Sequence, residues 1–100
     1  MLWAISRVCK PNTEKQREAN LTAHREFLTS QKAILVLSGA QFDDEGKEQV
    51  VSLLIVNVNS RAEAEKFINA DPFIKAGLFT DVKITRMRKG NWNPQVAEGA

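Results

Sequence analysis

The fold of this chain is decided by the stretch Asp71-Pro72-Phe73-Ile74-Lys75-Ala76-Gly77-Leu78-Phe79, where a helix-compatible run gives way to a strand. Pro72 disfavours helical backbone angles for the residue before it, so Asp71 marks the end of the preceding helix. Gly77 then permits a turn that other residues resist. A carboxylate at a helix C-terminus faces the negative end of the helix dipole, so we expect Asp71 to need a cation or a hydrogen-bond donor.

A second helix and a last strand flank this stretch. Ser60 with Glu63 three residues later is a capping box, which predicts a helix that runs to about Ala70. Its buried side is marked by apolar residues at helical spacing, namely Ala64, Phe67 and Ile68. After the turn, apolar residues alternate with polar ones over Phe79–Met87, which predicts a strand.

The first 30 residues predict a strand followed by a long helix. Residues 2–8 alternate as a strand does, and Pro11-Asn12 ends it. Thr13 with Gln16 fits a capping box, and nothing breaks a helix over residues 13–30. One side of this helix carries four side chains at spacings of four, three and four, which are Arg17, Leu21, His24 and Leu28. The only histidine therefore lies on the apolar side of the helix.

The middle of the chain predicts a β-hairpin. Residues 33–37 form too short a run for a helix and too apolar a run for a loop, so we predict a strand over residues 33–40. Residues 43–47 have turn chemistry, and the β-rich run Gln49–Asn57 follows. The resulting order, β-α-β-β-α-β, is the ferredoxin-like arrangement of an α+β fold, a four-stranded antiparallel sheet with two helices on one face.

Both faces of the third strand are apolar. Three apolar residues point to one side and three to the other, namely Val51, Leu53 and Ile55 against Val50, Leu54 and Val56. An antiparallel sheet covered on one face only should carry polar residues on its open face. The chain is too short to supply a third layer, so a second copy is the simplest cover, and we predict a homodimer or a higher even-numbered oligomer.

Length and composition limit the classes of function. One hundred residues make one domain, which we place at residues 1–88, with a C-terminal tail at residues 89–100 that is loose unless Trp92 docks it. A formal charge of +2 does not by itself indicate a polyanionic partner, and we interpret the basic run Arg86-Met87-Arg88-Lys89 as a solvated strand end. We therefore expect no nucleic-acid partner, and no membrane association because no apolar run is long enough to cross a membrane.

The cysteine and histidine content predicts a reducing compartment and no metal. Cys9 is the only cysteine, so no intrachain disulfide is possible, and residues 1–7 lack the features of a signal peptide. We therefore expect a cytoplasmic protein. One cysteine and one histidine are too few for a protein-only transition-metal site, and there is no glycine-rich phosphate loop.

His24 and Asp71 are the residues with the clearest chemical potential. Both helices of this fold lie on one face of the sheet, so a histidine on the first and an acid at the end of the second can share a cleft. The carboxylate would fix the imidazole tautomer and leave its other nitrogen for general acid–base chemistry. Each has a plainer interpretation, His24 as a core-edge histidine and Asp71 as the cap of its own turn. Arg17 would bind an anionic substrate group or form a surface ion pair with a glutamate.

These residues resemble the YciI-like (YCII-related) family of small dimeric α+β barrel proteins. The resemblance covers about residues 1–88 and is carried by Asp71-Pro72-Phe73, Ala76-Gly77-Leu78-Phe79, Arg17, His24, Gly39 and Ala64. It implies enzymatic work through a His–Asp pair, here His24 and Asp71. Two positions depart from the family pattern. Leu21 stands where an arginine is common, which argues against a strongly anionic substrate, and Gly39-Ala40 stands where Gly-Pro is usual, which alters the cleft wall.

The sequence therefore predicts a dimeric α+β barrel with one cleft in each subunit. His24 and Asp71 would be catalytic, and the small molecule would be bound by five further residues, Arg17, Ser38, Gly39, Phe73 and Leu78. The expected reaction is proton transfer, such as isomerisation or elimination, on a small cyclic or aromatic compound without a metal or an organic cofactor. The alternative is a non-catalytic homodimer that binds a small molecule in the same cleft or is purely structural.

Overall fold

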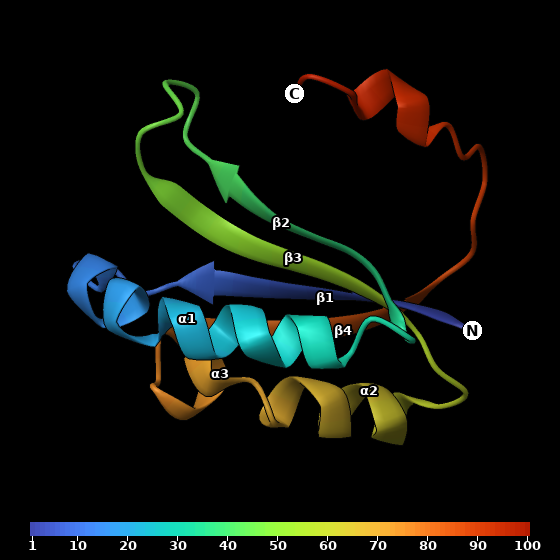
Figure 1. Cartoon of the computed structure of the whole chain (residues 1–100), viewed down its shortest axis with the longest axis horizontal. Helices are drawn as coiled ribbons and strands as arrows, with labels where there is room; N and C mark the ends of the chain where they lie inside the picture. The colour runs from blue at the N-terminus through green and yellow to red at the C-terminus, as the bar shows by residue number, and fades with distance from the viewer.

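The chain folds in the predicted β-α-β-β-α-β order, as a computed structural model of residues 1–100 shows (Figure 1). The strands are β1 (Leu2–Cys9), β2 (Leu35–Phe42), β3 (Gln49–Asn57) and β4 (Phe79–Met87). The helices are α1 (Glu14–Ser30), α2 (Arg61–Asn69), the four-residue α3 (Pro72–Lys75) and the 3-10 helix η1 (Pro94–Ala97). All strand pairs are antiparallel in the order β2-β3-β1-β4, and the three α-helices lie on one face of the sheet.

The core lies between the sheet and α2. Trp3 and Ile5 of β1 are buried beside Leu54 and Val56 of β3, and Ile5 pairs with Leu54 across the two strands. Helix α2 covers them with the apolar side predicted from its sequence, Ala64, Phe67 and Ile68. Because side chains alternate along a strand, Arg7 is the next residue of β1 to face the helices, and it is 0% exposed. A charged side chain therefore enters the interior.

Helix α1 is less deeply packed than α2. It begins at Glu14, and the capping box predicted at Thr13 is wrong, because the Thr13 hydroxyl donates to the Lys10 carbonyl (2.8 Å) and makes no cap bond to the helix. No residue of α1 is fully buried, although Phe27 and Leu28 pack against the edge of the core. The helix leaves a cavity between itself and the β2–β3 half of the sheet.

The joint between α2 and α3 differs from the sequence prediction in one respect. The capping box that starts α2 is confirmed, since the Ser60 hydroxyl accepts from the Glu63 amide (3.2 Å). Asp71, however, does not simply end a helix. It caps the start of α3, where its Oδ1 accepts from the Phe73 amide (3.0 Å). Pro72 is favoured at the first position of a helix, so the carboxylate lies at the positive end of a helix dipole, not the negative end.

The hairpin of β2 and β3 is shifted at its first strand. Strands β3 and β4 have the predicted bounds, but β2 begins two residues later than predicted and extends to Phe42. The end of α1 continues into a turn in which the amides of Ile34 and Leu35 both donate to the Gln31 carbonyl (3.0 Å). This turn takes the first two residues of the predicted strand. The turn that follows β2 has the expected chemistry, since an Asp43 carboxylate oxygen accepts from the Lys47 amide (2.9 Å).

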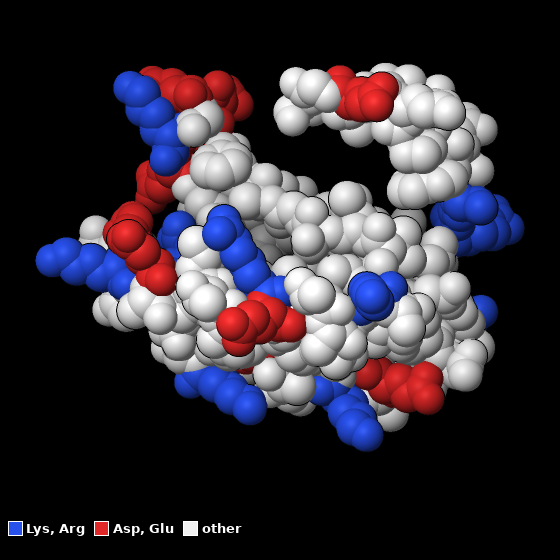
Figure 2. All heavy atoms as spheres, in the orientation of Figure 1, with Lys and Arg blue, Asp and Glu red and all other residues white.

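The sheet face opposite the helices is apolar along β3 and has no layer above it. It carries Val51, Leu53 and Ile55 on β3, and the two partners of Ile55, Ala4 and Leu37, add to it. Polar residues such as Ser6 on β1 and Lys83 on β4 border this apolar strip. The surface on this side, between the hairpin tip and the C-terminal tail, is largely uncharged (Figure 2). The prediction of two apolar faces is therefore confirmed for β3.

The C-terminal tail leaves the sheet after Met87 and curves round on the side of the uncovered face (Figure 1). The backbone hydrogen bonds of η1 and the residues after it join only near neighbours in the sequence. Trp92 is 55% exposed, so its ring does not enter the core. No helix of the chain combines the length and apolar character needed to cross a membrane.

Candidate active site

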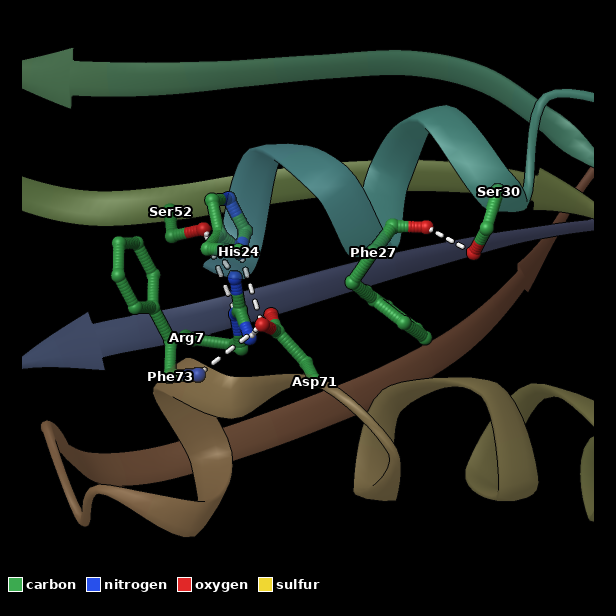
Figure 3. A network of polar contacts seen from close by, with 7 residues as sticks. All are labelled: Arg7, His24, Phe27, Ser30, Ser52, Asp71 and Phe73. Atoms are coloured by element: carbon green, nitrogen blue, oxygen red, sulfur yellow. Dashed lines mark hydrogen bonds and ion pairs between the residues drawn. The ribbon is translucent and has the colours of Figure 1, made fainter. Parts of the chain in front are cut away.

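The site is centred on Asp71, which is 0% exposed and is bound from three directions (Figure 3). Its Oδ2 accepts from Nη1 of Arg7 (2.6 Å), a residue of β1. Its Oδ1 contacts Nδ1 of His24 on α1 (2.8 Å) and accepts from the Phe73 amide of α3 (3.0 Å). The strand β1, the helix α1 and the four-residue helix α3 thus meet at one carboxylate.

The surroundings of Asp71 keep it ionised. Burial by itself would raise the pKa of this carboxyl, but the hydrogen bonds from His24 and Phe73 and the charge of Arg7 outweigh burial, so the pKa of Asp71 lies below its ordinary value. An ionised carboxylate can only accept, so the Nδ1 atom of His24 carries the proton of this contact. The imidazole tautomer is thereby fixed, and Nε2 is the acceptor nitrogen of the neutral ring.

Arg7 belongs to this site and was missed by the sequence analysis. Its Nε and Nη2 atoms donate to the Ser52 hydroxyl (3.3 and 2.9 Å), and its guanidinium carbon lies 4.3 Å from the centre of the Phe79 ring. Burial lowers the pKa of Arg7 while Asp71 raises it, and a guanidinium stays protonated in proteins. The available signal was alternation, since Trp3, Ile5 and Arg7 share one face of β1.

His24 is held in place by two contacts and lines a cavity. Its Nδ1 binds Asp71, and its ring stacks on Phe73 with centroids 3.9 Å apart and planes 6° from parallel. Nε2 makes no hydrogen bond within the protein, and the side chain is 12% exposed. The ring therefore has one nitrogen without a partner in the protein, and His24 lines a cavity of about 250 Å³ between α1 and the hairpin.

The structure gathers most of the predicted residues around this cavity. Those in its lining are Arg17, His24, Ser38, Gly39 and Phe73. Asp71 lies behind His24 and not in the lining. Leu78 is also absent from it; its side chain is buried elsewhere, and its carbonyl accepts from the Lys10 amide (2.9 Å). Lining residues that were not predicted as site residues include Leu21, Arg25, Leu28 and Ser52.

The plainer interpretations of these residues fare differently. His24 has a carboxylate partner where a core-edge histidine would have a backbone one. Asp71 does cap its own turn, and it binds His24 at the same time. Arg17 forms no ion pair with a glutamate. No group of three or more His, Cys, Asp or Glu side chains is arranged to hold a metal ion.

Comparison with known families identifies the chain. The model of the YCII-related domain matches residues 1–88. This chain belongs to the YCII-related family. Among solved structures, this YCII-related protein is similar to 5-chloro-2-hydroxyhydroquinone dehydrochlorinase from Burkholderia phenoliruptrix in complex with 2,5-dihydroxybenzoquinone. The two are 32% identical over 90% of this chain and 96% of that chain, with a TM-score of 0.80.

More distant structures share the fold alone. A protein from Pseudomonas aeruginosa is 15% identical over 90% of this chain and 93% of that chain, with a TM-score of 0.54. A protein from Mycobacterium tuberculosis is 13% identical over 89% and 95%, with a TM-score of 0.51. No curated protein matches the sequence. The YCII-related chain thus has the fold of the dimeric α+β barrel proteins, as its sequence predicted.

Proposed function

We propose that this YCII-related protein is an enzyme that moves protons on a small cyclic or aromatic compound, with His24 as the general acid–base group. The observation that carries the proposal is the His24 ring at the cavity wall, bound at Nδ1 by an ionised carboxylate and free at Nε2. A base of this kind accelerates proton transfer by about 10²- to 10⁴-fold. Asp71 would fix the tautomer, and Phe73 would hold the plane of the ring.

The reaction we favour is an elimination from a hydroxylated ring. The relative that is 32% identical is a dehydrochlorinase of a chlorinated hydroquinone, and it was solved with a dihydroxybenzoquinone. That likeness, together with a single acid–base residue and a cavity of ring size, supports the same class of substrate for this chain.

Loss of HCl from a chlorinated hydroquinone can be written with one proton-transfer residue. His24 would take a proton from one ring hydroxyl and return it to the carbon that bears chlorine, which gives a chlorinated dienone. It would then take the proton of the second hydroxyl, whose O–H electrons form the second C=O while chloride leaves with the C–Cl electron pair. The diol is oxidised to a quinone as the chlorinated carbon gains hydrogen, so the scheme needs no external oxidant.

Chloride release from 2-chlorohydroquinone and its ring-substituted analogues, with quinone absorbance followed in parallel, tests the proposal. We expect turnover by the purified protein. His24→Gln should lower the turnover rate by about 100-fold or more, since general acid–base groups contribute about that much. Cys9→Ser is the matched control, because Cys9 lies outside the cavity lining. Turnover that survives in folded His24→Gln would overturn the assignment. A ring compound that binds unchanged, with affinity retained in His24→Ala, would instead favour the non-catalytic binder.

We include a homodimer and a cytoplasmic location in the proposal. The uncovered apolar face of β1, β2 and β3 supports a dimer packed sheet to sheet, since such a patch on a soluble monomer is uncommon. Cys9, as a single free thiol, supports a reducing compartment. Light scattering at micromolar concentration is expected to give twice the chain mass of 11.2 kDa, and a well-folded monomer would remove the dimer from the proposal.

A further inference from the structure

The cavity beside His24 has an unbalanced charge. Two arginines, Arg17 and Arg25, belong to its lining, and no aspartate or glutamate does. The remaining lining residues are apolar or neutral, apart from His24 itself. Any ligand that enters therefore meets two positive charges and no negative one.

Neither arginine is neutralised by another part of the chain. The ion pairs of the protein are Arg7 with Asp71, His24 with Asp71, and Lys47 with Glu45. The charge of Arg7 is balanced by Asp71 within the interior, so it adds little to the field in the cavity. Arg17 and Arg25 are left as uncompensated cations.

The position of Arg25 changes what Leu21 implied. Residues 17, 21 and 25 follow one another at intervals of four, which places them in one row along α1. Leu21, taken alone, argues against a strongly anionic substrate because it is uncharged. Arg25 lies one turn further along the same row and lines the same cavity, so the row carries a second arginine although position 21 is a leucine.

We propose that the substrate of this cavity is an anion, a single ring that carries a negatively charged oxygen substituent held by Arg17 and Arg25. The inference rests on the proposed function in one respect, that this cavity is the substrate site, and it names the substrate class. The charged oxygen is a carboxylate or an ionised ring hydroxyl, since a guanidinium recognises both by charge-assisted hydrogen bonds. Leu21 and Leu28, which lie on the same wall, suit the apolar faces of the ring.

Arg17 is the stronger of the two expected contacts. It is partly buried, whereas Arg25, although it also lines the cavity, is an exposed residue. A hydrogen bond to a charged group is worth about tenfold or more in affinity, but an exposed ion pair is worth about threefold. We expect the two contributions to be screened to different degrees by salt, with that of Arg25 lost first.

Titration calorimetry with two matched pairs of probes tests the inference. The first pair is 2,5-dihydroxybenzoate and its neutral amide, 2,5-dihydroxybenzamide, which differ in the carboxylate. The second is 2,5-dihydroxybenzoquinone, whose conjugated hydroxyls ionise in neutral solution, and the neutral 2,5-dimethoxybenzoquinone. We expect at least one anion to bind about tenfold more tightly than its neutral partner, and the pair that shows this identifies the charged group.

Substitution then assigns the effect to the cavity. Arg17→Gln is expected to weaken the anion about tenfold and Arg25→Gln about threefold, with no effect on the neutral probe. Lys32→Gln removes the same unit of charge at an exposed position outside the cavity lining and is expected to leave both affinities unchanged. Anions that bind no better than their neutral partners, or an effect of Lys32→Gln equal to that of Arg17→Gln, would overturn the inference.

The outcomes for the inference and for the proposed function are separable. His24-dependent turnover of neutral hydroquinones without any preference for anions would overturn the anionic substrate and leave the acid–base enzyme standing. Arg17-dependent binding of anions without turnover of any ring would support the anion site and overturn the enzyme.

Discussion

Substitution of Asp71 and Arg7, separately and together, tests whether they act as one buried charge pair. Both side chains are 0% exposed, and Nη1 lies 2.6 Å from Oδ2. Unit charges about 4 Å apart attract by about 4 kcal/mol at an effective dielectric constant of about 20, and breaking a buried pair costs about 3–5 kcal/mol. We expect Asp71→Asn to lower the free energy of unfolding by about 4 kcal/mol, because it leaves a buried guanidinium without a counter-ion.

Arg7→Met leaves the carboxylate with two remaining donors, the Phe73 amide and the His24 ring, and is expected to cost about 3 kcal/mol. The double variant leaves neither charge buried alone, so its loss should fall short of the sum of the single losses by about 2 kcal/mol or more. Urea denaturation followed by circular dichroism at one protein concentration measures all three variants. Losses that simply add would refute the reasoning.

The Arg7–Asp71 pair also predicts how the free energy of unfolding depends on pH below neutrality. Although burial alone would raise the pKa of Asp71, its hydrogen bonds and the charge of Arg7 place it below the unfolded-state value of about 3.9. The contribution of Asp71 is therefore present above that value and is lost as pH falls through the lower folded-state value. Below about pH 4 the wild-type protein should lose stability more steeply than the double variant, as urea midpoints at several pH values would reveal. Equal slopes would exclude Asp71 as the group responsible.

Three further changes test single contacts. Ser52→Ala removes the hydroxyl that accepts two hydrogen bonds from Arg7, so it should lower the free energy of unfolding in urea by about 1.5–3 kcal/mol. Ser6→Ala, at a serine without a side-chain hydrogen bond, should lower it little, and equal losses for the two variants would contradict the prediction. Phe73→Leu removes the ring stacked on His24 and should lower kcat about three- to tenfold while the circular dichroism spectrum stays unchanged. An unaltered kcat would show that stacking does not orient the imidazole. Burial raises the pKa of the Cys9 thiol, so iodoacetamide should alkylate Cys9 more slowly than free cysteine. Cys9→Ser should leave turnover within about a few-fold of the wild-type rate, and rapid alkylation with loss of turnover would contradict both expectations.

The order of helices and strands could be predicted from the sequence because a turn or cap signal marks each place where the spacing of apolar residues changes between helical and strand periodicity. The bounds of β3 and β4 followed from the polar turn at residues 43–47 and from Gly77. The start of β2 could not be found in this way, because Ala33 and Ile34 are as suitable for a strand as Leu35. Ala33 and Ile34 lie outside the strand because the amides of Ile34 and Leu35 donate to the Gln31 carbonyl in the turn at the end of α1.

The candidate site was predictable to the extent that topology places residues together. His24 and Asp71 were expected to meet because both helices lie on one face of the sheet, and they do. Arg7 shares the alternation of Trp3 and Ile5 along β1, but it was not predicted as a site residue because an arginine in an alternating strand is ordinarily at the surface. Its burial depends on Ser52, opposite it on β3, and on Asp71, which is 64 residues away in the sequence. Asp71 was expected at a helix end, but the four-residue α3 that it caps is too short to be predicted from periodicity.

The long sequence separation within the site bears on how the protein keeps its fold over time. The two side-chain contacts of Asp71 close separations of 64 and 47 residues, and closing loops of that length costs chain entropy before the contacts contribute. A charge pair stabilises little until water has been excluded and both partners are in place. We therefore expect the contacts of Arg7 and His24 with Asp71 to slow unfolding more than they speed folding. On this expectation, the carboxylate that holds the histidine at the cavity also lengthens the lifetime of the native state.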